Sequence, residues 1–132
     1  MKRISMILAI MAALFGFMST GFAAAPGVKG DKLESIEMFL LSDLGSGVET
    51  LQANAAFYLG ELKSQKAVIP LMKLLHSGAT EETRILAALS LTKIGDPRGL
   101  YAVQQNIKFD DSPRVRRMCA IFDNAQRAEG LK

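Results

Sequence analysis

The fold is decided by residues 53–84, ANAAFYLGELKSQKAVIPLMKLLHSGATEETR. Apolar residues recur here every three or four positions, which is the spacing of an amphipathic helix, and short polar segments interrupt the pattern. The stretch therefore reads as a helix, a tight connection and a second helix, and it recurs downstream with the same spacing. One such pair cannot bury its own apolar face, so the sequence predicts a stack of helical hairpins.

The repeat has a period of 32 residues. Three consecutive blocks, 31–62, 63–94 and 95–126, align without an insertion. Apolar residues share columns, as in Ile36 with Val68 and Leu100, and Phe39 with Leu71 and Val103. Small residues share two adjacent columns in the second half of each block, namely Ala55, Ala87 and Cys119 followed by Ala56, Ala88 and Ala120. Small side chains at one place in every second helix predict a close and regular helix approach.

The pattern predicts six helices, at about residues 33–44, 49–62, 66–76, 81–94, 98–108 and 113–128. Pro97 and Pro113 stand at the first positions of their helices, where a proline is well tolerated. The residues expected to cap helix starts are Ser64, Thr80, Asp96 and Ser112. Pro70 lies within the second turn of its helix, which predicts a kink or a late start.

The terminal blocks depart from the pattern. In the first block, Lys32 and Val48 occupy the capping columns, and in the last block Asp123 stands where Leu59 and Leu91 stand in the others. Terminal repeats of a stack often carry polar residues on an outer face. The expectation is that Asp123 faces water.

Residues 1–25 have the three parts of a secretory signal peptide: the basic Lys2 and Arg3, an apolar run and a small-residue end. Cleavage after Ala23 or after Ala25 fits the small-residue rule. An uncleaved membrane anchor is the alternative, although polar residues shorten the strongly apolar part to about 15 residues. We expect export to the periplasm or the exterior, without membrane attachment after cleavage. Residues 26–30 then form a flexible lead-in, and 127–132 a C-terminal tail.

Removing Lys2 and Arg3 lowers the net charge from +3 to +1. A nearly neutral exported chain is a poor nucleic-acid binder, because such binding needs many contacts from a positive surface to phosphates. Cys119 is the only cysteine, so no intramolecular disulfide can form. Its place in the small-residue column predicts burial, with intermolecular pairing or redox chemistry as the alternative.

The segments AAFYLGELKSQKAVIPLMKLL, ALSLTKIGDPRGLYAV and SPRVRRMCA resemble the short HEAT repeats of phycobilin-lyase-like proteins. The inter-repeat turn of that family matches Gly95, Asp96, Pro97 and Arg98. Its Val-Arg pair matches Val115 and Arg116, its Arg alone matches Arg84, and Gln52 replaces that Arg in the first block. The resemblance implies an all-α protein, an α-solenoid of three hairpins that binds other proteins through its curved surface.

Few residues suggest chemistry. His76 is the only histidine, so the His-Glu pairs of HEAT-like di-iron hydroxylases are missing, and a zinc site lacks its ligands. The expected role of His76 is a favourable charge at a helix end. No catalytic residue, cofactor or metal is predicted. A lyase activity related to bilin lyases is the less favoured alternative, since a shared repeat is not a shared reaction.

Charge is distributed unevenly along the repeats, with −5 in block 31–62, +3 in 63–94 and +1 in 95–126. This pattern fits an electrostatically oriented partner or head-to-tail self-association, or else it is incidental to solvated faces. The candidate partner contacts are Tyr58, Glu61, Arg114, Arg117 and Arg127. Arg116 is assigned a structural role by its column, and core packing of at least one ring of the Phe57–Tyr58 pair is expected.

The sequence therefore predicts an exported, non-catalytic protein-binding module or adaptor. It would act through the exposed faces of helices 49–62, 81–94 and 113–128. The alternative is a stabilising subunit or cap of a larger envelope complex, because three repeats are near the minimum for independent stability.

Overall fold

The computed structural model describes residues 30–130. The expected signal peptide (1–25), residues 26–29 of the lead-in and the last two residues lie outside this range. Residues 33–132 form one compact unit, and of the other unit, 1–32, only the start of the first described helix is included. The described range contains the helices α2 (Gly30–Leu44), α3 (Glu49–Glu61), α4 (Val68–Ser77), α5 (Glu81–Ile94), α6 (Pro97–Phe109) and α7 (Pro113–Gly130), with the short 3-10 helix η2 (Gln65–Ala67) before α4.

These bounds agree closely with the predicted helices, and α5 matches its prediction at both ends. The awkward Pro70 is accommodated by a late start. The chain first forms η2, and α4 begins at Val68, so Pro70 is the third residue of its helix. A proline costs no intrahelical hydrogen bond there, because the first N–H groups of a helix have no partner within it.

Three of the four expected capping residues cap. Thr80 Oγ1 accepts from the Thr83 N–H at 3.2 Å, and Asp96 Oδ1 accepts from the Arg98 N–H at 2.9 Å. Ser112 Oγ accepts from the N–H groups of the second and third residues of α7, both at 3.2 Å. These bonds satisfy donors that a helix start leaves free.

The prediction for Ser64 is wrong. Ser64 makes no capping bond, because the segment after it starts as the 3-10 turn of η2 rather than as an α-helix. Its hydroxyl instead donates to Glu37 Oε1 of α2 at 2.5 Å. This bond, and after it the ammonium of Lys66, lower the pKa of Glu37. Ser64 therefore ties α2 to the second repeat.

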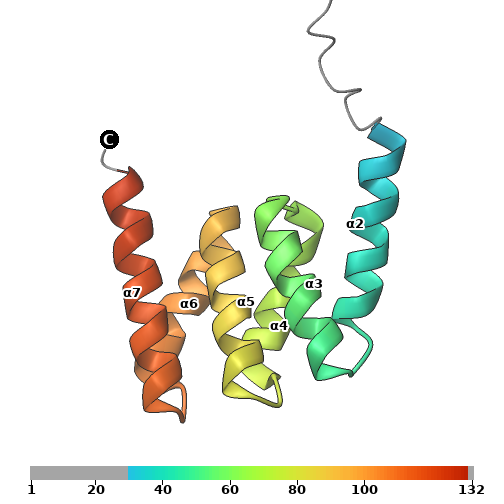
Figure 1. Ribbon diagram of the computed structural model, residues 1–132. Helices are drawn as coiled ribbons and strands as arrows, with labels where there is room; N and C mark the ends of the chain where they lie inside the picture. Colours follow the sequence, from blue (N-terminus) through green and yellow to red (C-terminus); the bar gives the residue numbers. More distant parts are fainter. Residues whose placement is uncertain (1–29, 131–132) are drawn as a thin grey trace, which may run out of the picture. The chain divides into compact units, whose positions relative to one another are not determined.

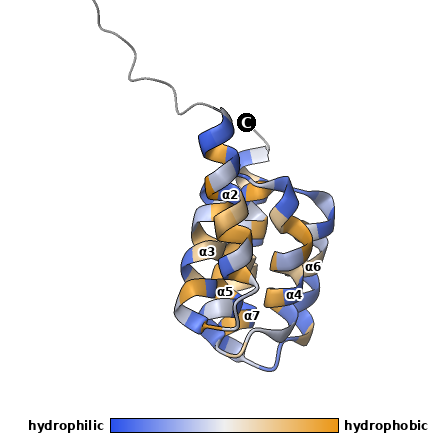
Figure 2. Cartoon of the chain, turned by 90° about the vertical axis from the view of Figure 1, so that its right-hand side faces the viewer, coloured by the Kyte–Doolittle hydropathy of each residue, from blue (hydrophilic) through white to orange (hydrophobic). Residues whose placement is uncertain are grey.

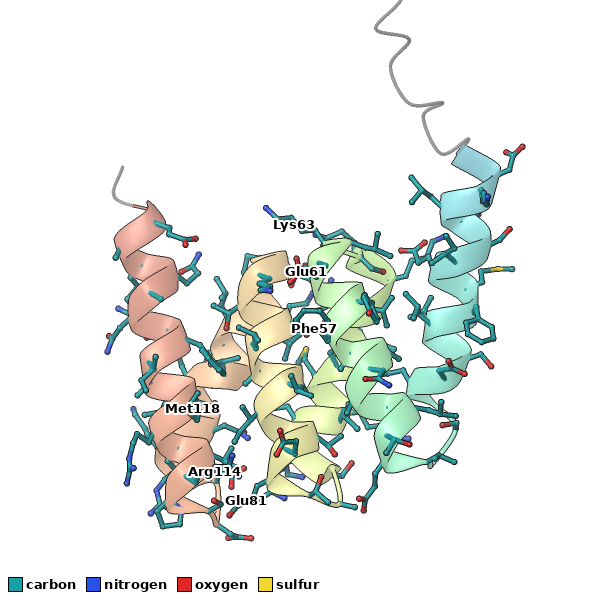
Figure 3. The ribbon with its side chains drawn as sticks, viewed as in Figure 1. Phe57, Glu61, Lys63, Glu81, Arg114 and Met118 are labelled. Carbon is teal, nitrogen blue, oxygen red and sulfur yellow. The ribbon has the colours of Figure 1, made fainter. Side chains whose placement is uncertain are left out.

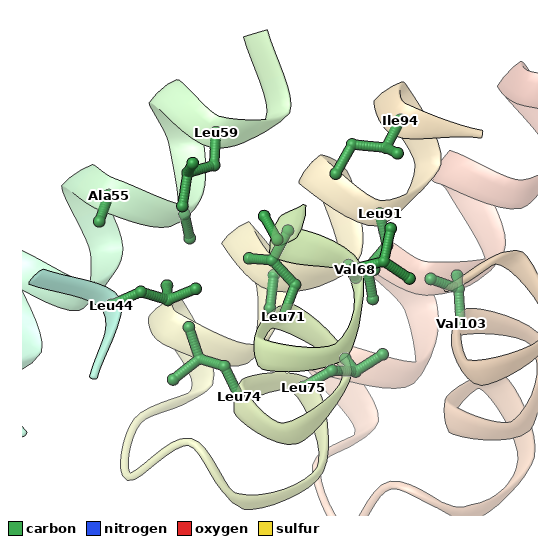
Figure 4. Close-up of a cluster of buried hydrophobic side chains, with 14 of the residues drawn as sticks. Leu44, Ala55, Leu59, Val68, Leu71, Leu74, Leu75, Leu91, Ile94 and Val103 are labelled. Atoms are coloured by element: carbon green, nitrogen blue, oxygen red, sulfur yellow. The ribbon is translucent and has the colours of Figure 1, made fainter. Parts of the chain in front are cut away.

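Within this unit the helices form two layers, with α3, α5 and α7 in one and α4 and α6 in the other (Figures 1 and 2). α2 lies beside α3 at one end of the row (Figure 1). Apolar residues of both layers meet between them, and Leu59 of α3, Leu71 of α4 and Leu91 of α5 are completely buried (Figure 4). The stack of hairpins thus shares one continuous core.

The matched apolar columns do not extend into α2 as the alignment predicted. Leu71 and Val103 are buried, whereas Phe39 in the same column is 66% exposed, and Ile36 is 42% exposed. The reason is packing: α4 and α6 lie against each other and against α5, while α2 packs only loosely on its neighbours. Leu44, at the end of α2, is its one buried residue within the described range. Figure 4 shows its side chain pointing into the core.

The closest junction between repeats joins α3 to α5. The alanines of the small-residue columns in these two helices are buried there: Ala55, Ala56, Ala87 and Ala88. Ser90 Oγ donates to the Ala56 carbonyl at 2.6 Å. A Cβ added to Gly60 would lie 2.7–2.8 Å from Ser90 atoms, including its backbone Cα. The junction therefore needs small residues on both helices, as the repeat columns predicted.

Asp123 does not face water as expected. It is only 7% exposed, although it occupies the column of Leu59 and Leu91. Gln104 Nε2 of α6 donates to its Oδ1 at 3.1 Å, and Arg127 Nε donates to its Oδ2 at 2.8 Å. A buried carboxylate is tolerated when charge and hydrogen bonds compensate it, and these two donors do so.

The α3–α5 junction gives a direct stability test. Gly60→Ala should lower the free energy of unfolding by about 1–3 kcal/mol, because the new methyl group must displace Ser90 and its backbone. Gly130→Ala is the matched control, since a Cβ there meets nothing within 4 Å. Urea denaturation followed by circular dichroism measures both. Equal stability of the two variants would contradict a close junction at Gly60.

Candidate protein-binding surface

The two arginines of the Val-Arg column hold the turns between paired helices. Arg84 Nη1 donates to the Gly78 carbonyl at 3.0 Å, and its equivalent, Arg116, donates from Nη1 to the Asp110 carbonyl at 2.5 Å. In the first repeat Gln52 Nε2 donates instead to the Leu44 carbonyl, at 3.2 Å. The three side chains do the same work, so this column is structural rather than a contact surface.

Arg84 also links its repeat to the next one. Its Nε and Nη2 donate to the two carboxylate oxygens of Asp110 at 3.2 and 3.3 Å. Asp110 is further held by Asn106 Nδ2 at 3.1 Å and by the backbone N–H of Ser112 at 2.9 Å. Asn106 Nδ2 lies 3.3 Å from the Leu75 carbonyl as well. The Asp110 side chain is 6% exposed and joins α4, α5 and α6 in one network.

An apolar column runs across the solvent side of α3, α5 and α7. Phe57, Leu89 and Ile121 occupy the same position of the 32-residue repeat. Phe57 is 37% exposed, Ile121 is 51% exposed, and Leu89 is half-buried. The core does not require these side chains, because the layer facing α4 and α6 is already filled by other residues. We call these three residues the apolar column.

Charged side chains flank the apolar column near the C-terminal ends of α3 and α5. Lys93 forms an ion pair with Glu61, which stands in the same repeat position one unit earlier. The Lys93 Nζ also lies 5.1 Å from the centroid of the Phe57 ring, within range of a cation–π contact. Figure 3 shows Phe57 and Glu61 on the same side of α3. The three side chains therefore hold one another in place across two repeats.

The expected burial of one aromatic ring is wrong. Tyr58 is 54% exposed, and Phe57 is exposed too, while the two rings contact each other edge to face with centroids 5.4 Å apart. In the column of Tyr58 the next repeat has Ser90, whose hydroxyl reaches the α3 backbone. This column faces the preceding helix in α5, whereas in α3 the loosely packed α2 leaves the Tyr58 ring in water.

At the other end of the column, Arg114 of α7 lies 3.5 Å from Glu81 and 4.0 Å from Glu82 of α5. Glu81 also accepts a hydrogen bond from Ser112 Oγ at 2.5 Å. Figure 3 shows Arg114 and Glu81 close together at the start of the two helices, with Met118 further along α7. These contacts tie the third repeat to the second.

The predicted contact residues do not form one patch. Tyr58 and Glu61 lie on α3, and the three arginines lie on α7. Of these arginines, Arg114 is bound to Glu81 and Glu82 and Arg127 to Asp123, whereas Arg117 is exposed and makes no salt bridge within residues 30–130. Sequence reasoning did not include the apolar column among the contacts, although its apolar character in all three blocks is visible in the alignment.

The remaining candidate groups carry no site chemistry in the described range. Cys119 is buried, and its burial, together with the charge of Asp110, raises the pKa of the thiol to about 11. The thiol is therefore protonated and unreactive at neutral pH. His76 is exposed in the last turn of α4. Residues 30–130 contain no cluster of His, Cys, Asp and Glu side chains arranged for a metal ion.

A family model of HEAT repeats matches residues 38–121. The chain belongs to the HEAT repeat family. HEAT repeats generally mediate protein–protein interactions. The comparison with curated proteins gave no match. Within residues 30–130 of this HEAT protein, no helix has the length and apolar character needed to cross a membrane.

The Arg84–Asp110 network predicts a second stability effect. Asp110→Ala should lower the free energy of unfolding by about 2–4 kcal/mol, because the largely buried Arg84 and Asn106 lose the carboxylate that they share and keep only backbone carbonyls as acceptors. Asp111→Ala, at an exposed neighbouring position, is the control and should change stability by less than about 0.5 kcal/mol. Thermal and urea unfolding measure both. If the two variants unfold alike, the network does not clamp the repeats.

Proposed function

We propose that the chain is an exported, non-catalytic HEAT-repeat module that binds a partner protein through the solvent side of α3, α5 and α7. The apolar column carries this proposal. Phe57, Leu89 and Ile121 repeat at one position in three successive units, and the core does not need them. Apolar side chains that gather on a surface often mark a protein-binding site.

The chemistry around the apolar column supports a protein partner. Interfaces combine an apolar centre with a polar rim, and aromatic and arginine residues often dominate their binding energy. Here the rim consists of the Glu61–Lys93 pair at one end and of Arg114 with Glu81 at the other. Because these ion pairs already exist in the free chain, the surface is ordered before binding, which lowers the entropy lost on association.

Export rests on the N-terminal sequence alone, with its basic start, apolar run and small-residue end. The module would then act in the periplasm or outside the cell. In such oxidising surroundings a cysteine without a disulfide partner is best kept buried, as Cys119 is. The absence of a catalytic role is proposed because neither the sequence motifs nor the side chains of residues 30–130 assemble a reactive group.

A second candidate function is a stabilising subunit of a larger envelope complex. It is favoured by the loose packing of α2, which leaves apolar residues of the first repeat in water. Another chain could cover this repeat and stabilise it by mass action. A midpoint of thermal unfolding that is low without that chain and rises when it is added would distinguish the subunit from the independent module.

Site-specific photocrosslinking tests the proposed surface. A photoreactive phenylalanine analogue is placed at Ile121, in the apolar column, and separately at Tyr101, a 63% exposed residue of α6 in the other layer. In the native host we expect one distinct crosslinked protein in the envelope fraction from position 121 and none from position 101. Ile121→Glu should abolish the same association in a pull-down. Equal crosslinking from both positions would contradict the proposal.

A further inference from the structure

We propose that the first repeat, α2 and α3, is a second docking surface, and that its occupant is a basic amphipathic helix of another protein. This inference is argued chiefly from the exposed apolar side chains of α2, and it shares only Phe57 with the apolar column. Its elements are unburied apolar side chains, a strong local negative charge and a helix that packs only loosely on its neighbours.

Exposed apolar residues concentrate in the first repeat. Within residues 30–130, nine of the thirteen large apolar residues that are exposed fall in the block 31–62: Leu33, Ile36, Met38, Phe39, Val48, Leu51, Phe57, Tyr58 and Leu62. The first four belong to α2, where Leu33, Ile36 and Phe39 are three residues apart and so lie along one side of the helix. The outer surface of this repeat therefore has the apolar character that interfaces bury.

The third repeat, at the other end of the array, has a polar network in place of exposed apolar side chains like those of α2. In α7 the column that holds buried leucines elsewhere contains Asp123, and this carboxylate is satisfied by Gln104 and Arg127. A polar network of this kind suits a surface that stays in water. The first repeat has no comparable closure among its described residues, so the exposed apolar side chains of α2 are not a general feature of this fold's ends.

The charge of the first repeat selects a basic partner. The block 31–62 carries −5, and the salt bridges that reach it from the second repeat involve only Lys66, with Glu34 and Glu37, and Lys93, with Glu61. Asp43 and Glu49 make no salt bridge within the described residues. Apolar side chains among carboxylates complement a helix that has leucine-like residues on one face and lysine or arginine beside them.

A second copy of this chain fits the surface poorly. Two first repeats facing each other would bring charges of −5 together, which disfavours a symmetric dimer. A head-to-tail contact would have to rely on Arg117, because Arg114 and Arg127 are already bound to carboxylates and Arg116 to backbone carbonyls within residues 30–130. A basic helix from a different protein meets neither obstacle.

Two designed peptides test the proposal with the mature chain. Each is an amphipathic helix of about 18 residues with leucines on one face, and the other positions are lysine in one peptide and glutamate in the other. Fluorescence anisotropy should show the lysine peptide binding at least about tenfold more tightly than the glutamate peptide, with an affinity that falls as salt rises. Phe39→Ser should weaken the lysine peptide by about tenfold or more.

Matched variants locate the site. Phe109→Ser, which removes a 74% exposed aromatic residue from α6, should leave the affinity unchanged, and so should Ile121→Glu in the apolar column. Met38→Ser, at a 61% exposed position of α2, repeats the test should the Phe39 variant lose helicity by circular dichroism. Loss of binding in the Ile121 variant would assign the peptide to the apolar column, which would refute this proposal while leaving the proposed function intact.

Equal binding of both peptides, or an equal loss in the Phe109 variant, would show unspecific apolar adsorption and overturn the inference. Analytical ultracentrifugation tests whether a second copy of the chain occupies this surface instead. We expect the mature chain to be monomeric at micromolar concentration. A dimer that Phe39→Ser dissociates would replace the basic helix by a second copy of the chain and would also overturn the proposal.

Discussion

The close approach of α3 and α5 is the contact on which the other features depend. Ser90 bonds the Ala56 carbonyl, and Gly60 leaves no space for a side chain beside it. The close packing of these two helices fixes how successive repeats align. That alignment places Lys93 beside Glu61 and over Phe57. The same stacking brings Asp110 within reach of Arg84. A larger residue at the junction would disturb the core and the outer surface together.

The two ends of the array differ in how their outermost helices are packed. Towards the C-terminus, α7 continues the stack and finishes with a satisfied buried carboxylate, Asp123. Towards the N-terminus, α2 is held by Leu44 and by the bonds from Ser64 and Lys66 to Glu37, and its outer apolar residues remain in water. The first repeat is thus the part of the described chain most open to a partner, whereas the apolar column depends on all three repeats.

Much of the architecture could be predicted because the repeat has a fixed period. A period of 32 residues identifies equivalent positions, so the helix bounds, the buried small residues and the family resemblance could all be read from the sequence. The period could not predict exposure. Phe39 shares a column with Leu71, but a column is buried only where a neighbouring helix covers it, and α2 lacks that cover. Asp123 shows the reverse, since its burial depends on Arg127 one turn away in α7 and on Gln104 in the neighbouring helix α6.

The candidate site was predictable only in part for the same reason. Whether an arginine is available depends on its acceptors. That of Arg114 lies in another helix and those of Arg116 lie in the turn before α7, whereas that of Arg127 lies one turn earlier in α7 itself. Hydrogen–deuterium exchange of the purified chain tests the central claim most directly, namely that stability centres on the α3–α5 junction and fades towards α2. Amides of α4 and α5 should exchange at least about 100-fold more slowly than those of α2. Protection of α2 equal to that of α5 would contradict this account.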